Sequence, residues 1–309
     1  MSILLAVILP GFLVIGAGYL AAKRGAIAPA GVDGLMRFSQ GIAIPCLLFK
    51  AMATLDLGQN FDLRIIATFY TGALTCFGIG VLAAHRLFGR DWEDSVAIGF
   101  IALFSNSLLL GLPITERAYG AGSTAANFAI IAIHSPFCYA VGITAMEIAR
   151  AHGQPVRAIP GTIARAIFSN ALIVGILLGF IVNITDLPIP TVADDALDLL
   201  TRAALPTALF GLGGVISRYR IEGDLPTILF TLSLSLLLHP AIAWVLGSAF
   251  HLPPDGFRSV VVTAAMAPGA NAYLFAALYG RAMRVAASCV LLGTALSILT
   301  AAGWLALLS

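Results

Sequence analysis

The stretch Phe104-Ser-Asn-Ser-Leu-Leu-Leu-Gly-Leu-Pro113 lies inside a long apolar segment of the chain. A membrane helix hides its backbone from lipid only if each N–H reaches the carbonyl four residues back, and Gly111 and Pro113 disturb that pattern. A Ser-Asn-Ser cluster directly precedes them. Irregular backbone at membrane depth is tolerated only where protein buries it or where it lines a cavity. The stretch therefore predicts a polar site within the membrane.

The composition of the chain is that of a membrane protein. Of the 309 residues, 60% are hydrophobic and 10% are charged, and the mean hydropathy of +0.98 is far above that of soluble domains. At about 20 residues per span, this length holds about ten helices. We therefore expect an all-α integral membrane protein with ten transmembrane helices. The formal net charge of +2 is small, so nucleic acid is not an expected partner.

The cysteines and the first apolar run narrow the class further. All four cysteines fall in apolar segments without paired spacing, which indicates buried thiols and neither a disulfide framework nor a metal site: Cys46, Cys76, Cys138 and Cys289. No metal or cofactor is expected. Lys23 and Arg24 follow the first apolar run and no basic residue precedes it. A cleaved signal peptide has the opposite order, so we interpret this run as the first span.

The apolar runs predict two halves of five spans each. The expected spans are 3–22, 34–54, 63–88, 95–119, 124–149, 162–183, 194–217, 225–250, 257–280 and 285–308. The polar connector 151–161 separates a first half, 1–150, from a second half, 162–309. Lys and Arg concentrate in the odd-numbered connectors. This pattern predicts that those connectors are cytoplasmic and that the N- and C-termini lie outside the plasma membrane.

The two halves share features at a nearly constant offset. Pro45 in the segment AIPCLLF and Pro206 in the segment ALPTALF are 161 positions apart. A Tyr-Gly pair ends spans four and nine at an offset of 160, and an aspartate precedes spans three and eight at an offset of 162. With five spans per half, the second copy must enter the membrane from the opposite side. Such inverted repeats are typical of secondary transporters, whose substrates bind near the midplane at the repeat interface.

The repeat predicts a second break, in span nine, at Ala267-Pro-Gly-Ala-Asn-Ala-Tyr273. We expect broken helices 4 and 9 to cross, so that half-helix N-termini with partial positive charge meet at mid-membrane. Such a site suits a carboxylate, to which the asparagine amides add hydrogen bonds without a buried charge. Alternatively, the prolines only kink packed helices and the asparagines bond across them. The candidate substrate-binding residues are Ser105, Asn106, Ser107, Pro113, Pro268, Asn271 and Tyr273.

Several motifs resemble the auxin efflux carrier family. Asn106, Gly111-Leu-Pro113 and Tyr119-Gly120 resemble the fourth-span signature of that family. Phe168-Ser-Asn170, with Gly175 and Gly179 beyond it, also resembles the family. A further group of residues is similar to the ninth-span motif, with looser spacing: Pro268, Asn271, Phe275, Ala276 and Tyr279.

The resemblance implies a fold and a function. The fold is two inverted five-helix repeats, with a scaffold domain and a transport domain interleaved across both, and members are usually homodimers. They export auxin in plants and move malonate, malate or similar carboxylates in bacteria, by an elevator-type alternating access. By motif, Asn106, Pro113 and Pro268 belong at the crossover, with Asn271 beside it. This chain lacks the long loop between spans five and six of many plant members, which favours a compact carrier of a bacterial inner membrane.

The ionisable residues bear on how transport is coupled. His134 and His239 lie inside spans five and eight, and each is either a proton-coupling group or a neutral packing residue. Lys50, late in span two, is expected to snorkel outward, with a direct substrate role as the alternative. The bile acid–sodium symporters, which have a related architecture, use an acidic residue near the ninth-span break. Neither break here has one, which favours uniport or proton-linked movement over sodium coupling.

An intramembrane enzyme and a non-transporting membrane receptor are the two alternatives from outside the class of carriers. An intramembrane enzyme needs a nucleophile–base pair or an aspartate dyad at depth, and no Asp or Glu lies deep in a predicted span. The sequence therefore argues against an enzyme. The receptor remains as an alternative function, and a sodium-coupled organic-anion symporter of the bile-acid symporter type remains as an alternative kind of carrier.

Overall fold

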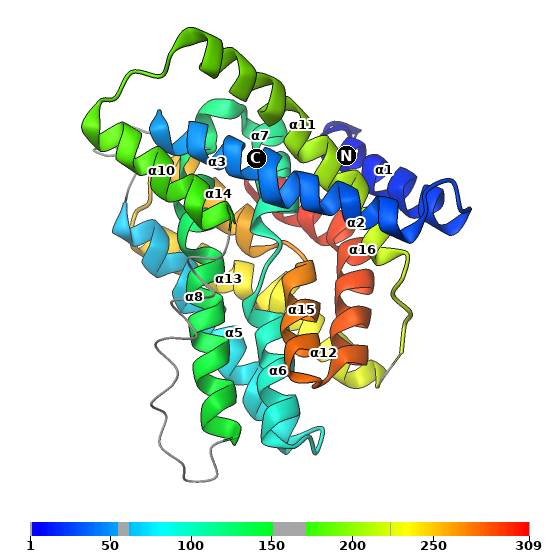
Figure 1. Ribbon diagram of the computed structural model, residues 1–309. Coiled ribbons are helices and arrows are strands. Elements are labelled where there is room, and N and C mark those ends of the chain that lie inside the picture. Colours follow the sequence, from blue (N-terminus) through cyan, green and yellow to red (C-terminus); the bar gives the residue numbers. More distant parts are fainter. Residues whose placement is uncertain (1, 55–61, 151–170, 223, 309) are drawn as a thin grey trace. The chain divides into compact units, whose positions relative to one another are not determined.

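The computed structural model describes residues 2–54, 62–150, 171–222 and 224–308, and Figure 1 shows their helices. No β-strand forms within these ranges, so the expectation of an all-α protein is confirmed there. The predicted connector 151–161 and the motif Phe168–Asn170 lie outside the described residues. The chain divides into two compact units: unit 1 is Met1–Leu9, Asp62–Ile163 and Tyr219–Ser309, and unit 2 is Pro10–Phe61 and Ala164–Arg218. Each unit takes segments from both halves of the sequence.

Within the described ranges, six helices are long and apolar enough to cross a membrane: Pro29–Ala53, Leu63–Arg86, Ala125–Arg150, Thr191–Ile216, Leu225–Ala249 and Met283–Leu308. Each lies at a predicted span. Two shorter apolar helices, Leu9–Lys23 and Val174–Thr185, fall in predicted spans one and six. The helices of predicted spans four and nine are interrupted, and each of their halves is too short to cross alone.

Unit 2 is built on close contacts between glycines and backbone. Its helices are α1 (Ser2–Lys23) from Pro10 onward, α2 (Pro29–Phe38), the π turn η1 (Ser39–Ala43), α3 (Ile44–Ala53), α10 (Ala171–Thr185) and α11 (Thr191–Ile216). A Cβ added at Gly18 would lie 1.9 Å from the Phe210 carbonyl oxygen, and one added at Gly213 would lie 1.9 Å from that of Ile15. Helices α1 and α11 therefore pack backbone against backbone, as small residues allow in membrane helices.

Unit 1 holds the remaining helices: α5 (Leu63–Arg86), α6 (Trp92–Leu103), η2 (Ser107–Gly111), α7 (Leu112–Tyr119), η3 (Ala121–Ser123), α8 (Ala125–Arg150), α12 (Leu225–Ser233), η4 (Leu234–Leu238), α13 (His239–Ala249), α14 (Pro254–Ala264), α15 (Ala270–Tyr279) and α16 (Met283–Leu308). Aspartates begin three of them. The carboxylates of Asp62, Asp91 and Asp224 accept hydrogen bonds from backbone N–H groups in the first turns of α5, α6 and α12. These caps satisfy donors that a helix start leaves open.

The core of unit 1 joins the first half of span four to the second half of span nine. The rings of Phe100 on α6 and Phe275 on α15 are stacked, with centroids 3.8 Å apart. Gly142 on α8 faces them, because a Cβ there would lie 2.4 Å from the Phe100 ring. Both phenylalanines are fully buried. Three helices distant in sequence are thus fixed around one aromatic pair.

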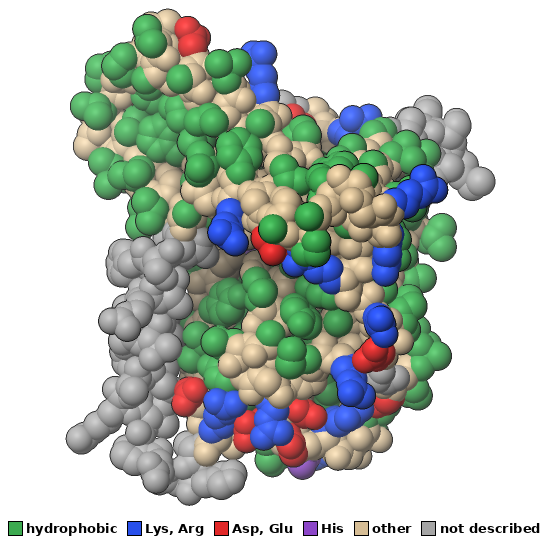
Figure 2. All heavy atoms as spheres, turned by 45° about the vertical axis from the view of Figure 1, so that its right-hand side comes forward, with side chains coloured by type: hydrophobic (Ala, Val, Ile, Leu, Met, Phe, Trp, Pro, Cys, Tyr) green, Lys and Arg blue, Asp and Glu red, His purple; other side chains and the backbone are tan. Residues whose placement is uncertain are grey.

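Charged side chains gather at the end of unit 1 where α6 begins and α15 ends, along the lower edge of Figure 2. Glu93 pairs with Arg150 at 3.0 Å and with Arg281 at 2.9 Å, and Arg281 also pairs with Asp91 at 3.2 Å. The guanidinium of Arg150 further donates to the carbonyl of Tyr279. These pairs join the outer ends of the same three helices whose middles meet at Phe100 and Phe275.

Candidate functional site

Two helix interruptions lie side by side in unit 1. Helix α6 ends at Leu103 before η2 begins at Ser107, and α14 ends at Ala264 before α15 begins at Ala270. The intervening segments form an antiparallel bridge between Ser105 and Pro268. Two backbone hydrogen bonds close it, from the N–H of Asn106 to the carbonyl of Ala267 (2.8 Å) and from the N–H of Gly269 to the carbonyl of Phe104 (3.1 Å). Non-helical backbone within apolar segments thus finds partners in protein, as a membrane requires.

The interruption in span four begins earlier than Gly111 and Pro113 suggest. The helix opens at residues 104–106, whereas Gly111 ends the π turn η2 and Pro113 lies in the first turn of α7. Pro113 lacks an N–H, and its ring would clash with a carbonyl four residues back. The chain avoids this clash by a wider turn, in which the N–H of Leu112 reaches back five residues to the carbonyl of Ser107. Pro113 therefore reshapes the helix after the break and does not open it.

A π turn also precedes two other prolines. Each described π turn ends two positions before a proline, and the pairs are η1 with Pro45, η2 with Pro113 and η4 with Pro240. At Pro240 the carbonyl four residues back, that of Leu236, accepts a hydrogen bond from the indole N–H of Trp304 at 3.0 Å. The displaced carbonyl thus finds a side-chain partner on α16. Single π turns of this kind are often found at functional sites.

Asn106 caps the helix that follows the break. It is buried, and its Oδ1 accepts a hydrogen bond from the N–H of Leu109 at 3.3 Å. Asn271 lies in the first turn of α15, where its Oδ1 accepts a hydrogen bond from the hydroxyl of Tyr139 at 3.5 Å. A Cβ added at Gly269 would lie 3.6 Å from the Cα of Asn106. The N-termini of η2 and α15 therefore meet at the bridge, each with an asparagine at its start.

The other candidate residues divide into two groups. Ser105 and Pro268 form the bridge, and Ser107 begins η2 next to it; the hydroxyl of Ser105 is buried without a hydrogen-bond partner. Tyr273 packs its ring against Tyr219 at a centroid distance of 4.8 Å. Because residues two apart on a helix do not share a face, Tyr273 points away from the face of Asn271. Pro113 lies about 9 Å along the helix from Ser107, at 1.5 Å per residue.

His134 contacts the break directly and His239 does not. The Nε2 of His134 lies 3.1 Å from the Ser105 carbonyl oxygen, and its ring meets Phe104 edge-on at 4.6 Å. A carbonyl can only accept, so Nε2 carries the proton. The Nε2 of His239 lies 3.1 Å from the Phe69 carbonyl oxygen, and its Nδ1 is buried without a partner. The ring of Phe69 contacts both imidazoles.

Sequence reasoning missed Tyr139, whose hydroxyl contacts Asn271. A tyrosine inside an apolar span belongs to no motif, so no local signal marks it. Asn127, inside α8, donates from Nδ2 to the hydroxyls of Thr115 (3.2 Å) and Thr263 (2.7 Å). This triad joins α7, α8 and α14.

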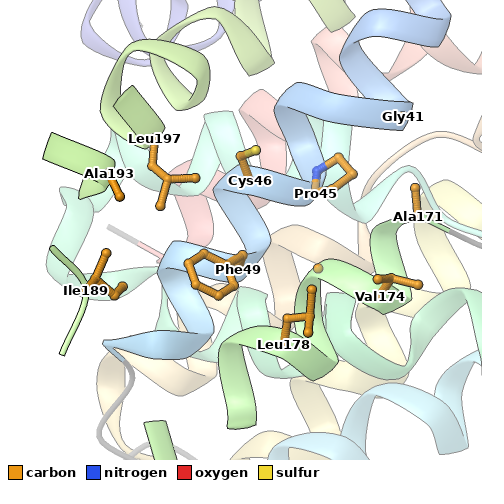
Figure 3. Close-up of a pocket in the computed structure, with 11 residues that line it drawn as sticks. Gly41, Pro45, Cys46, Phe49, Ala171, Val174, Leu178, Ile189, Ala193 and Leu197 are labelled. Atoms are coloured by element: carbon orange, nitrogen blue, oxygen red, sulfur yellow. The ribbon is translucent and has the colours of Figure 1, made fainter. Parts of the chain in front are cut away.

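Lys50 and a separate cavity belong to unit 2. The ammonium of Lys50 pairs with Asp194 at 2.8 Å and with Asp198. A cavity of about 650 Å³ lies between α3, α10 and the start of α11, and Figure 3 shows its lining. None of the candidate substrate-binding residues lines this cavity. Among the residues that the structure describes, no three His, Cys, Asp or Glu side chains are grouped to hold a metal ion.

Comparisons with known proteins agree on the class. Residues 3–305 match the model of a family described as "Membrane transport protein". The "Putative malonate transporter" of Rhizobium meliloti is 23% identical over 308 residues, which cover 97% of this chain and 94% of that protein. An "Uncharacterized transporter" of Methanothermobacter thermautotrophicus is 26% identical over 293 residues, or 93% of this chain and 92% of that protein. The "Lysosomal cholesterol signaling protein" of Mus musculus is 26% identical over 216 residues, or 65% of this chain and 24% of that protein.

Proposed function

Because the chain belongs to the auxin efflux carrier family of membrane transport proteins, we propose that it is a secondary transporter that moves a small carboxylate by alternating access. Family membership makes it a transport protein and not an enzyme. The relative named for malonate matches nearly the whole chain, which supports a carboxylate as substrate. Efflux and facilitated movement both fit this role.

The observation that carries the proposal is the meeting of two helix N-termini at the Ser105–Pro268 bridge. The first turns of a helix leave N–H groups without intrahelical partners and carry about half a positive charge. Two such ends attract a carboxylate without a buried Lys or Arg. The amides of Asn106 and Asn271 supply the directed hydrogen bonds that fix its orientation.

The proposal includes an architecture of ten spans arranged as two inverted halves. Both broken helices belong to unit 1, so unit 1 acts as the transport domain and unit 2 as the scaffold. We expect a homodimer in a bacterial inner membrane with both termini outside. An elevator-type movement of unit 1 carries the bridge and its substrate between the two sides.

Proton linkage is proposed through His134. Its imidazole already donates to the Ser105 carbonyl in the break, so a change in its protonation changes the surroundings of the site. His239 is a second proton-coupling candidate, connected to His134 through the ring of Phe69. Sodium coupling is the alternative, and flux with and without a sodium gradient separates the two.

Transport of a labelled carboxylate into proteoliposomes tests the proposal. A thermal-shift screen over mono- and dicarboxylates first selects the acid that stabilises the protein most, because a ligand that binds only the folded state raises its stability. The expected result is saturable flux of that acid, absent from empty vesicles. Stabilisation by no carboxylate, together with no flux of any, contradicts the proposal.

A receptor without turnover is the second candidate function. The similarity to a protein named for lysosomal cholesterol signaling favours it, although this chain covers only 24% of that relative. A receptor binds its ligand and moves none, so ligand-induced stabilisation without flux in either direction identifies it.

A further inference from the structure

The cavity in unit 2 is a slot between three helices. Figure 3 shows Cys46 and Phe49 of α3, Val174 and Leu178 of α10, and Ala193 and Leu197 of α11 around one space. Its volume is about 650 Å³. Every cavity-lining side chain is apolar apart from the thiol of Cys46.

Glycine contacts explain why the slot lies beside α3 and α10. A Cβ added at Gly175 would lie 2.4 Å from the Pro45 carbonyl oxygen, and one at Gly179 would lie 2.4 Å from that of Phe49. Asn183 fixes the end of this pair by donating to the carbonyls of Met52 and Ala53. The two backbones touch along this line, so the larger side chains stand to one side and face α11.

The apolar lining of the slot suits a hydrocarbon chain. A water molecule needs two to four polar partners, and apolar cavities stay dry. The slot is open at α10, because Val174 is 41% and Leu178 is 50% exposed. Leu177, Ile181 and Ile184 continue the exposed aliphatic surface along the same helix. In a bilayer, such an opening admits an acyl chain.

A charged cluster lies next to residues that line the slot. Asp194 and Asp198 follow the lining residues Ala193 and Leu197 on α11, and both bind the ammonium of Lys50, which follows the lining residue Phe49. Two carboxylates share one ammonium, which leaves one negative charge. The two aspartate side chains are 41% and 42% exposed. The cluster therefore has room for a second ammonium donor.

We propose that unit 2 binds a phospholipid with an ethanolamine head, with an acyl chain in the slot and the head ammonium on Asp194 and Asp198. The primary ammonium has three N–H donors for the carboxylates. A choline head carries the same charge without any N–H donor, and a glycerol head leaves the lipid with a net negative charge. The order of preference is therefore ethanolamine, then choline, then glycerol.

Competition between lipids tests the head group. The full-length protein is exchanged into equimolar ethanolamine, choline and glycerol phospholipids with identical acyl chains, and retained lipid is measured by native mass spectrometry. We expect about tenfold preference for ethanolamine over glycerol, the ratio that one charge-assisted hydrogen bond supplies. D194N and D198N should each reduce the preference severalfold. D195N removes the same charge from the same turn, outside the Lys50 pair, and should leave the preference unchanged.

Cys46 reports whether the slot is filled. It is the half-buried cysteine of the four, and Cys76, Cys138 and Cys289 are buried. Labelling by a small membrane-permeant maleimide should be several times faster after delipidation and slow again when ethanolamine lipid returns. Ala193→Trp fills the slot and should slow labelling without lipid, whereas Val192→Trp, at an adjacent position that is 82% exposed, should not.

Three results overturn the proposal. Equal retention of the three lipids would show that the protein has no site selective for the ethanolamine head group. Lipid-independent protection of Cys46 that grows with protein concentration assigns the slot to a second copy of the chain. Rapid labelling of Cys46 in every lipid shows that nothing occupies it. None of these readouts depends on transport.

Discussion

At the residue scale, hydrogen bonds hold both asparagines of the proposed site: Asn106 Oδ1 accepts from the Leu109 N–H, and Asn271 Oδ1 accepts from the Tyr139 hydroxyl. Asn106 and Asn271 could be selected because an amide inside an apolar span is rare and each stands beside a helix breaker. Their hydrogen bonds could not be predicted: the one from the Leu109 N–H to Asn106 and the one from the Tyr139 hydroxyl to Asn271. Both depend on the rotation of a helix about its axis, which apolar sequence on all sides does not specify.

Replacing His134 by Gln tests its role in proton linkage. The glutamine amide can still donate to the Ser105 carbonyl, but it cannot take up a proton. We expect wild-type flux to change with pH, and the variant to keep its flux while losing that dependence. Tyr70 and Cys138, the titratable neighbours of the imidazole, remain in place.

The control for this test is His251→Asn. His251 is exposed and has a φ of 50°, a conformation that asparagine tolerates. It should retain the wild-type pH profile. An unchanged pH profile in His134→Gln would assign the imidazole to packing alone.

At the element scale, proline position predicted disturbed helices but not the form of the disturbance. The ring of Pro113 selects the π turn η2. The break before that turn, at residues 104–106, comes from pairing with residues 267–269 on a distant segment. Sequence alone located both interruptions within a few residues. Their antiparallel bridge is tertiary structure and has no local signal.

Pro113→Ala should weaken substrate binding. Alanine restores the N–H and removes the ring clash, so the π turn can revert to α-helix and rotate α7 relative to Asn106 by about 100°, one residue of a helix. We expect at least a tenfold loss of carboxylate affinity, measured by the thermal-shift titration. Pro45→Ala removes the equivalent proline after η1 in unit 2 and should leave affinity unchanged. Equal affinities in both variants would count against this account of the turn.

Two glycines on α1 provide a matched test of helix packing in unit 2. Gly18→Ala places a Cβ 1.9 Å from the Phe210 carbonyl oxygen, and we expect a loss of about 1–3 kcal/mol from the backbone shift it forces. Gly16→Ala meets nothing within 4 Å and should be neutral or stabilising by up to about 1 kcal/mol. Thermal unfolding in detergent compares them, and similar melting temperatures would contradict the packing.

At the scale of the whole molecule, hydropathy and charge predicted the class of protein and the positions of the apolar helices. They could not show that each compact unit combines segments from both halves of the chain. Such assembly depends on long-range contacts, for example Phe100 with Phe275. Topology, dimerisation and membrane orientation remain predictions from Lys and Arg placement and from family resemblance.

The ion-pair cluster of unit 1 should make stability depend on acidity. The hydrogen bond from Arg281 is the main cause that lowers the pKa of Glu93 below its usual value of 4.5; burial opposes this effect and Arg150 adds to it. A carboxyl with a lowered pKa stabilises the fold above its unfolded pKa, and that contribution is lost as pH falls through the folded value.

Melting temperature in detergent should therefore fall as pH drops below about 4.5. Glu93→Gln lacks the carboxylate that pairs with Arg281, so it should melt at a lower temperature than wild type near neutral pH. Because glutamine has no carboxylate to protonate, its melting temperature should fall less steeply in acid. Parallel declines for the variant and the wild type would show that other groups govern the acid sensitivity.

In the proposed site, two helix N-termini and their asparagines bind a carboxylate at the Ser105–Pro268 bridge. Asn106→Asp keeps an oxygen to cap Leu109, and Asn271→Asp keeps an acceptor for Tyr139, but each adds a negative charge where the anion binds. The most direct test is counterflow of labelled carboxylate in proteoliposomes. These contain wild type, Asn106→Asp, Asn271→Asp, Asn106→Ala or Asn271→Ala. We predict that all four variants lose counterflow and that the two aspartate variants retain wild-type thermal stability. Wild-type counterflow in the folded Asn106→Asp and Asn271→Asp variants would contradict the claim.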